Sequence, residues 1–237
     1  MPLMQWHKSP MEIVQAYEIR HPGSNIGPLA MWAAWSVESL HYLADIDQLQ
    51  IGYPASVAGH HADVIDIAHV RWATGTAITS LDLCAATAGR LFCGSTKTVE
   101  LDLRAFQTYK RKHRGLLRRI QKRIPSKYRP FFDHRFQEKR SRQVQDRRAK
   151  IPIELLAWID DVLSDQRYID IHGARNRFTH AWLSRTLPEG GTPGHAERTG
   201  FRIRKSDKAL NAREMVEMAQ NLATDQVTSF FNLLDGL

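Results

Sequence analysis

Apolar residues recur every three or four positions over several long stretches of the chain, which is the spacing of an amphipathic helix. Alternation with a period of two, which would indicate strands, is almost absent. The sequence therefore predicts an all-α fold, a bundle of four to five main helices. The predicted helices cover about residues 28–49, 62–92, 153–162, 165–184 and 206–234.

Three other stretches interrupt this pattern. The opening through Pro28 contains turn signals, such as the Pro-Gly pair at 22–23. Residues 101–150 keep part of the helical periodicity, which Pro125 and Pro130 break, and we predict a basic helical insertion there. Residues 187–199 are rich in glycine and proline and indicate a short hairpin-like loop before the last helix. We expect one helical domain over 1–237, with 101–150 as the insertion.

The predicted helix over 62–92 contains many small residues, among them Ala73, Gly75 and Ala77. Small side chains allow a neighbouring helix to approach closely. Trp72, in the same stretch, is predicted to anchor the core. The sequence thus predicts that a neighbouring helix packs closely against this one.

Charge is distributed unevenly. Residues 104–150 contain 18 lysines and arginines but three acids, so this stretch carries +15 while the whole chain carries +8 and the remainder −7. Aromatic residues interleave with the cations, a mixture that binds phosphates by charge and bases by stacking. The alternative is a solvated insertion whose aromatic residues dock on the body. The candidate nucleic-acid-binding residues are Lys110, Arg111, Lys112, Arg114, Arg118 and Arg119.

The N-terminal sequence, the longest apolar stretch and the cysteine content together indicate the compartment of the protein. Residues 1–10 hold no apolar run of the kind that a secretory signal needs, and the apolar stretch at 26–35 is shorter than a membrane span. Two cysteines are too few for a disulfide framework and are typical of a reducing compartment. We expect a cytoplasmic protein without a membrane partner.

A candidate catalytic motif lies at Arg175-Asn176-Arg177-Phe178-Thr179-His180. An imidazole titrates near neutral pH and can take a proton from a ribose 2′-hydroxyl, while a guanidinium can hold the phosphate and stabilise its charge. Asn176 lies four residues before His180, on the same helical face. RNA supplies its own nucleophile, so this chemistry needs neither a metal nor another cofactor. Arg175 and His180 are separated by about 140° on an ideal helix, so their convergence requires a bent helix or a second subunit.

The Arg–His spacing alone is not specific. About three matches are expected by chance in a chain of this composition, and three occur: Arg129–His134, Arg167–His172 and Arg175–His180. An asparagine directly after the arginine lowers the chance expectation to about 0.02. Of the three matches, only Arg175–His180 has an asparagine directly after the arginine.

The residues Arg175-Asn176-x-x-x-His180 resemble the R-x4-6-H motif of the HEPN superfamily, and the helical setting is similar as well. The resemblance covers about residues 62–92 and 151–234. It implies a homodimer with composite active sites, endoribonuclease activity that leaves a 2′,3′-cyclic phosphate, and a defence or toxin–antitoxin setting in which an antitoxin or other regulatory protein can bind. Some HEPN toxins have a tyrosine two residues after the histidine, where an antitoxin adds a nucleotide; this chain has Trp182 there.

Other interpretations stay open at this point. A cluster of metal-ligand types at residues 60–69 completes no recognised site, and we expect surface polar residues there: His60, His61, Asp63, Asp66 and His69. Arg175 and His180 could also line a polar helix face without catalysis. The chain would then be a nucleic-acid-binding or regulatory protein, or a structural helical dimer with a basic surface.

Overall fold

The protein is described by a computed structural model that covers residues 6–42, 58–94, 102–107, 142–180 and 212–237; at 58–67, 176–180 and 212 it describes the helical backbone only. All regular structure in these residues is helical, which confirms the predicted all-α fold. The elements are α1 (Pro10–Arg20), α2 (Gly27–Tyr42), α4 (Ala58–Cys93), the 3-10 helix η2 (Leu103–Ala105), α7 (Ile153–Ser164), α8 (Gln166–His180) and α9 (Ala212–Gly236). Residues 142–148 are helical too.

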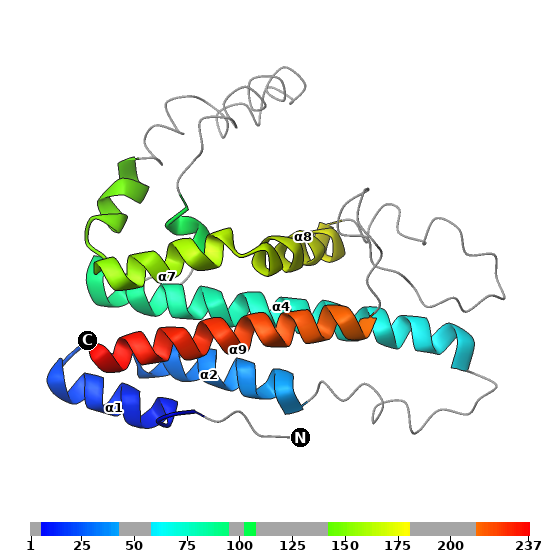
Figure 1. Ribbon diagram of the computed structural model, residues 1–237, viewed down its shortest axis with the longest axis horizontal. Coiled ribbons are helices and arrows are strands. Elements are labelled where there is room, and N and C mark those ends of the chain that lie inside the picture. The colour runs from blue at the N-terminus through cyan, green and yellow to red at the C-terminus, as the bar shows by residue number, and fades with distance from the viewer. Residues whose placement is uncertain (1–5, 43–57, 95–101, 108–141, 181–211) are drawn as a thin grey trace, which may run out of the picture.

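The helices pack in layers around α4 and α9 (Figure 1). α1 and α2 lie on one side of this pair, and α7 and α8 follow one another along the other side. α4 contacts α2, α8, α9 and η2, so it is the common neighbour of most other elements. In the described part of the chain, no helix has the length and hydropathy that a membrane span needs.

The predicted helices correspond to α2, α4, α7, α8 and α9, but α1 was not predicted. Its start is set by local polar contacts, because the Ser9 backbone N–H donates to the Glu12 carboxylate at 3.2 Å and Pro10 occupies the first position. Ile13 and Tyr17 then bury one side of it. The turn expected after it is present, with Gly23 at φ +88°.

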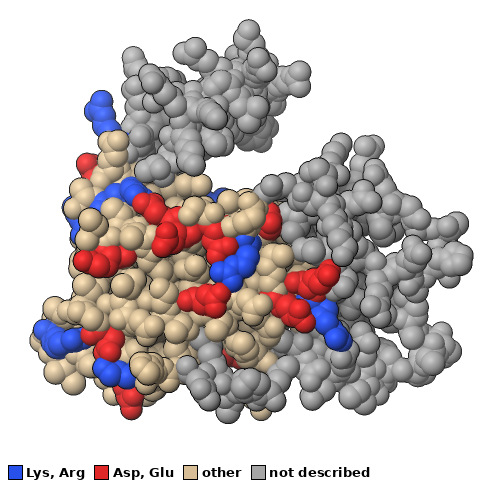
Figure 2. Space-filling view, viewed as in Figure 1, with Lys and Arg blue, Asp and Glu red and all other residues tan. Residues whose placement is uncertain are grey.

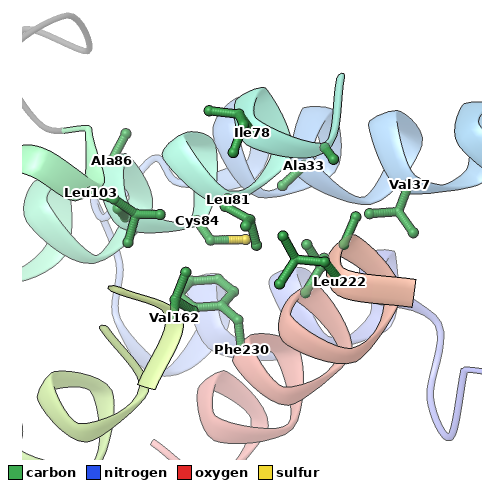
Figure 3. Packing of buried hydrophobic residues seen from close by; sticks show 14 of the residues in the cluster. Ala33, Val37, Ile78, Leu81, Cys84, Ala86, Leu103, Val162, Leu222 and Phe230 are labelled. Carbon is green, nitrogen blue, oxygen red and sulfur yellow. The ribbon is translucent and has the colours of Figure 1, made fainter. Parts of the chain in front are cut away.

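Small residues bring the central helices close together, as the sequence predicted. Ala73 and Ala77 of α4 and Ala33 of α2 are fully buried. Gly75 is an exception to that prediction, because a Cβ added there would meet no atom within 4 Å. Trp72 is partly buried against the core. Figure 3 shows Leu81 and Cys84 of α4 in one cluster with Phe230 of α9 and Val162 of α7.

Several sequence predictions lie outside the described residues. These are the loop at 187–199, the helix continuations at 43–49 and 181–184, and most of the basic insertion with all six of its candidate nucleic-acid-binding residues. Of the insertion, the structure describes η2 and residues 142–150. Arg148 joins these two pieces to α7, since its guanidinium donates to the Phe106 carbonyl at 3.1 Å and pairs with both oxygens of Asp160 at 2.7 and 2.6 Å.

Replacing Phe230 tests the core. Its ring is fully buried and lies 5.2 Å from the Trp158 ring, centroid to centroid. Phe230→Ala should lower the free energy of unfolding by about 3–5 kcal/mol, because the lost contacts leave a cavity. Urea denaturation measures the change. Ile153→Ala is the control, since Ile153 is 76% exposed and should change stability by less than about 0.5 kcal/mol. Equal losses in the two variants would contradict this packing.

Candidate functional site

The whole predicted motif lies on α8. Arg175 is half-buried, and Asn176 and His180 belong to the last turns of the same helix, where the structure describes the backbone only. Tyr168, Ile171 and Ala174 bury the inner side of α8. Arg175 is seven residues after Tyr168, so the two occupy the same side of the helix. Arg175 therefore lies on the side of α8 that faces α4 and η2.

Asp82 of α4 is the acidic group of this region. Its Oδ1 accepts the backbone N–H of Leu103 at 3.1 Å, which ties η2 to α4. Burial raises the pKa of this carboxyl to about 6. The negative charge of Asp102 acts in the same direction, whereas the Leu103 N–H and the guanidinium groups of Arg175 and Arg104 oppose the shift.

The 3-10 helix η2 presents Arg104 at the edge of this region. The Asp102 carboxylate caps the turn by accepting the Ala105 N–H at 2.9 Å. Leu103, Ala105 and Phe106 are buried and hold η2 in the core, while Arg104 between them is exposed. The Arg104 guanidinium contacts Nε2 of His172 on α8.

His172 is held as a neutral imidazole. Burial, and after it the positive charges of Arg104 and Arg175, lower its pKa to about 4, while the negative charge of Asp102 acts in the opposite direction. Because a guanidinium only donates hydrogen bonds, Nε2 is the acceptor and the proton of the ring is on Nδ1. The Tyr168 ring stacks on the imidazole at 5.6 Å. Burial also raises the pKa of Tyr168, so its phenol stays protonated.

The second Arg–His match, Arg167–His172, is explained by structural contacts. Arg167 pairs with Asp165 at 2.8 Å and with Asp225 of α9 at 2.6 Å, and these bonds raise its pKa. It therefore fixes the start of α8 to α9, while His172 is engaged by Arg104. The match Arg129–His134 lies outside the described residues.

The structure thus brings together one residue that the sequence had singled out, Arg175, and four that it had not: Asp82, Arg104, Tyr168 and His172. Asp82 had one available signal, because it is the one charged residue between Arg71 and Arg90 of α4. Tyr168 and His172 lie on α8 with Arg175, and the sequence named His172 only as part of the Arg167–His172 match. Arg104 comes from a distant segment that no linear motif connects to α8.

No metal site is found among the described residues. His69 was predicted on the surface with four other metal-ligand types, but it is buried, 6% exposed, with its ring 5.8 Å from that of Trp72. The prediction of a surface position is wrong for His69, because this residue lies on the inward side of α4, next to the buried Val70. The side chains of His60, His61, Asp63 and Asp66 lie outside the described residues.

Comparisons of the chain with models of protein families, with curated proteins and with solved structures found no match.

Two opposing pH effects are expected from this site. The raised pKa of Asp82 stabilises the fold below about pH 4, and this stability is lost as pH rises to about 6. The lowered pKa of His172 stabilises the fold above about pH 6.5, and this stability is lost as pH falls to about 4. Relative to wild type, Asp82→Asn should therefore gain about 1–3 kcal/mol as pH rises from about 4 to about 6.

His172→Gln should show the opposite trend, gaining stability relative to wild type as pH falls from about 6.5 to about 4. Glutamine keeps an acceptor for Arg104 but does not titrate. Urea denaturation at a series of pH values measures both differences. A stability difference between Asp82→Asn and wild type that stays constant with pH would contradict the assignment of this carboxyl.

Proposed function

We propose that the chain is a metal-independent endoribonuclease of the HEPN type, with Arg175, Asn176 and His180 as its catalytic residues. The observation that carries the proposal is that the entire motif belongs to one helix, α8, and that Arg175 is half-buried in this helix, which packs against α4. A surface arginine that served only solvation would have no reason to lie there. Of the two other Arg–His matches, the one that the structure describes is accounted for by ion pairs and packing.

In the proposed reaction, the ribose 2′-oxygen attacks the adjacent phosphorus and the bond to the 5′-oxygen of the next nucleotide breaks. His180 takes the proton of the 2′-hydroxyl, and the departing 5′-oxygen gains a proton from water. Arg175 holds the phosphate and stabilises its charge, and Asn176 orients the imidazole or the phosphate. The products are a 2′,3′-cyclic phosphate and a 5′-hydroxyl.

Charge supports a role for the basic segment in RNA recruitment. Exposed acids, including Asp160, Asp161 and Asp225, lie on the elements α7 and α9, and Figure 2 shows acidic side chains spread over this face. The residues outside 104–150 carry a net charge of −7, so the +15 of residues 104–150 supplies the attraction for a polyanion. RNA, and an antitoxin or other regulatory protein as a further partner, belong to this proposal.

The helix geometry favours a homodimer. Ile169, Gly173, Asn176 and His180 follow one stripe of α8 by their spacing. Ile169 is 44% exposed, and a Cβ at Gly173 would meet no atom within 4 Å, so the stripe begins on open surface. Arg175 is about 140° away from His180 around the helix. A second copy can supply the histidine that one chain cannot bring to its own arginine.

His180→Ala tests the catalytic role. The purified chain should cleave single-stranded RNA in excess EDTA, and His180→Ala should lower the rate by at least about 100-fold because no base remains for the 2′-hydroxyl. His41→Ala is the matched control, since His41 bonds Thr224 at 2.7 Å on the opposite side of α4. Cleavage by His180→Ala at the parental rate would contradict the proposal. RNA bound in a salt-dependent manner but left intact would favour the non-catalytic binding protein instead.

Mixing two inactive variants tests the composite site. In a heterodimer of Arg175→Ala and His180→Ala, one cross-chain site keeps both residues and the other loses both. Refolding the two together should restore about a quarter of the wild-type rate, because half of the dimers are mixed and each has one intact site. Each variant alone should stay inactive. No recovery despite exchange of subunits would place Arg175 and His180 of the same chain in one site.

A further inference from the structure

Arg104 is an exposed arginine on a turn that is fixed at both ends. On one side of it, the backbone N–H of Leu103 donates to Asp82 of α4 at 3.1 Å. On the other side, the backbone carbonyl of Phe106 accepts a hydrogen bond from Arg148 at 3.1 Å. The side chains of Leu103 and Phe106 are fully buried. The short helix η2 therefore presents Arg104 from a preorganised backbone, which lowers the entropy cost of binding a ligand there.

The partner of the Arg104 guanidinium is a neutral group. It donates a hydrogen bond to Nε2 of His172 on α8, and this imidazole is uncharged at neutral pH. Two other arginines that join elements pair with carboxylates instead: Arg148 with Asp160, and Arg167 with Asp165 and Asp225. A neutral acceptor orients a guanidinium without cancelling its charge. Arg104 therefore keeps its charge and its other N–H donors for an anion.

Two acids lie near Arg104, but neither forms an ion pair with it in the part of the chain that the structure describes. The Asp102 carboxylate accepts the Ala105 N–H at 2.9 Å, and Asp82 accepts the N–H of Leu103. Both carboxylates thus bind the backbone of η2. They fix the position of the turn and leave the Arg104 guanidinium to its contact with α8.

That contact brings Arg104 to the part of α8 that carries Arg175. His172 and Arg175 are three residues apart, and such residues are neighbours on a helix surface, with Cβ atoms about 5–6 Å apart. The charge environment of His172 supports this arrangement, because both arginines contribute, after burial, to its lowered pKa. One guanidinium from η2 and one from α8 therefore lie near the same imidazole.

We propose that Arg104 is a second phosphate-binding residue of the candidate site and that His172 is the residue that positions it. The ligand is the sugar–phosphate backbone of RNA, so the inference rests on the proposed function. Arg175 holds the phosphate at which cleavage occurs, and Arg104 holds a neighbouring phosphate through the bidentate contact that a guanidinium makes. Such a contact strengthens RNA binding equally before and during the reaction.

Binding of an RNA that cannot be cleaved tests Arg104. A single-stranded RNA with a 2′-O-methyl group on every nucleotide has no attacking hydroxyl, and fluorescence anisotropy measures its affinity over a range of salt concentrations. Arg104→Gln should weaken binding about 10-fold or more, because a charge-assisted hydrogen bond is lost. It should also reduce the slope of log affinity against log salt by about 0.7, the contribution of one phosphate contact on a single strand.

Two further variants separate charge, geometry and general effects. Arg104→Lys keeps the positive charge but loses the planar fork, so it should keep the salt slope and weaken binding less than Arg104→Gln does. Arg20→Gln is the matched control, because Arg20 is exposed on α1, on the opposite side of α4 and α9 (Figure 1). It should leave both the affinity and the salt slope unchanged.

A double-mutant cycle tests the positioning role of His172. His172→Ala should weaken binding of the methylated RNA when Arg104 is present, because the guanidinium loses the acceptor that orients it. In the Arg104→Gln background the same change should have no further effect. Equal losses in the two backgrounds would show that His172 does not act through Arg104, and the positioning role would be overturned.

The outcomes distinguish this inference from the proposed function. If wild type cleaves unmodified RNA but Arg104→Gln binds the methylated RNA with wild-type affinity and salt slope, the role of Arg104 is overturned and the proposed function stands. If wild type binds the methylated RNA through Arg104 but leaves unmodified RNA intact, the proposed function fails and the phosphate contact stands. Failure of wild type to bind the methylated RNA at low salt would overturn the phosphate contact.

Discussion

The close packing of α4 is the constraint on which the rest of the structure depends. α2, α8, α9 and η2 all contact this one helix, and they approach it over small, fully buried residues such as Ala73, Ala77 and Ala85. A larger residue at any of these positions would push two layers apart. The same packing determines where the site lies, because Asp82 occupies the turn of α4 that faces η2 and α8.

The Asp82 carboxyl group reduces the stability of this closely packed helix, because burial opposes its ionisation. Burial opposes its ionisation more than the neighbouring guanidiniums and the Leu103 N–H favour it, which is why its pKa rises to about 6. An asparagine would accept the same N–H without the cost of a buried charge. The hydrogen bond to η2 therefore does not explain why the residue is an acid. The charges of Arg175 and Arg104 favour the ionised carboxylate, but they do not outweigh burial.

Most of the fold could be predicted because it depends on periodicity. α4 and α9 are long, and their apolar stripes are visible in the sequence alone. α1 was not predicted, because the sequence feature that marks it is a local cap at Ser9 rather than a long apolar stripe. Of the predicted helical insertion, the described residues 102–107 form a 3-10 turn at 103–105, which Asp102 caps and which the buried Leu103 and Phe106 hold in the core, and residues 142–148 are helical.

The site could be predicted only in part, for a different reason. The three residues that we propose as catalytic, Arg175, Asn176 and His180, are neighbours in sequence, so a linear motif contains them. Asp82, Arg104 and His172 meet only after three segments fold together, and their charges have meaning only in that arrangement. The Arg167–His172 spacing shows the converse, since two residues that fit the motif have other partners.

The low basicity of His172 bears on how another histidine of α8 would act as a catalytic base. Burial, together with the positive charges of Arg104 and Arg175, lowers the pKa of His172 to about 4, so this imidazole is a weak base at neutral pH. A catalytic histidine must keep its basicity while it acts on the RNA whose phosphate the arginine holds. Separation by about 140° around α8 keeps His180 away from Arg175 of its own chain. A base from a second copy would meet that arginine across a bound phosphate, whose negative charge preserves the basicity of the imidazole.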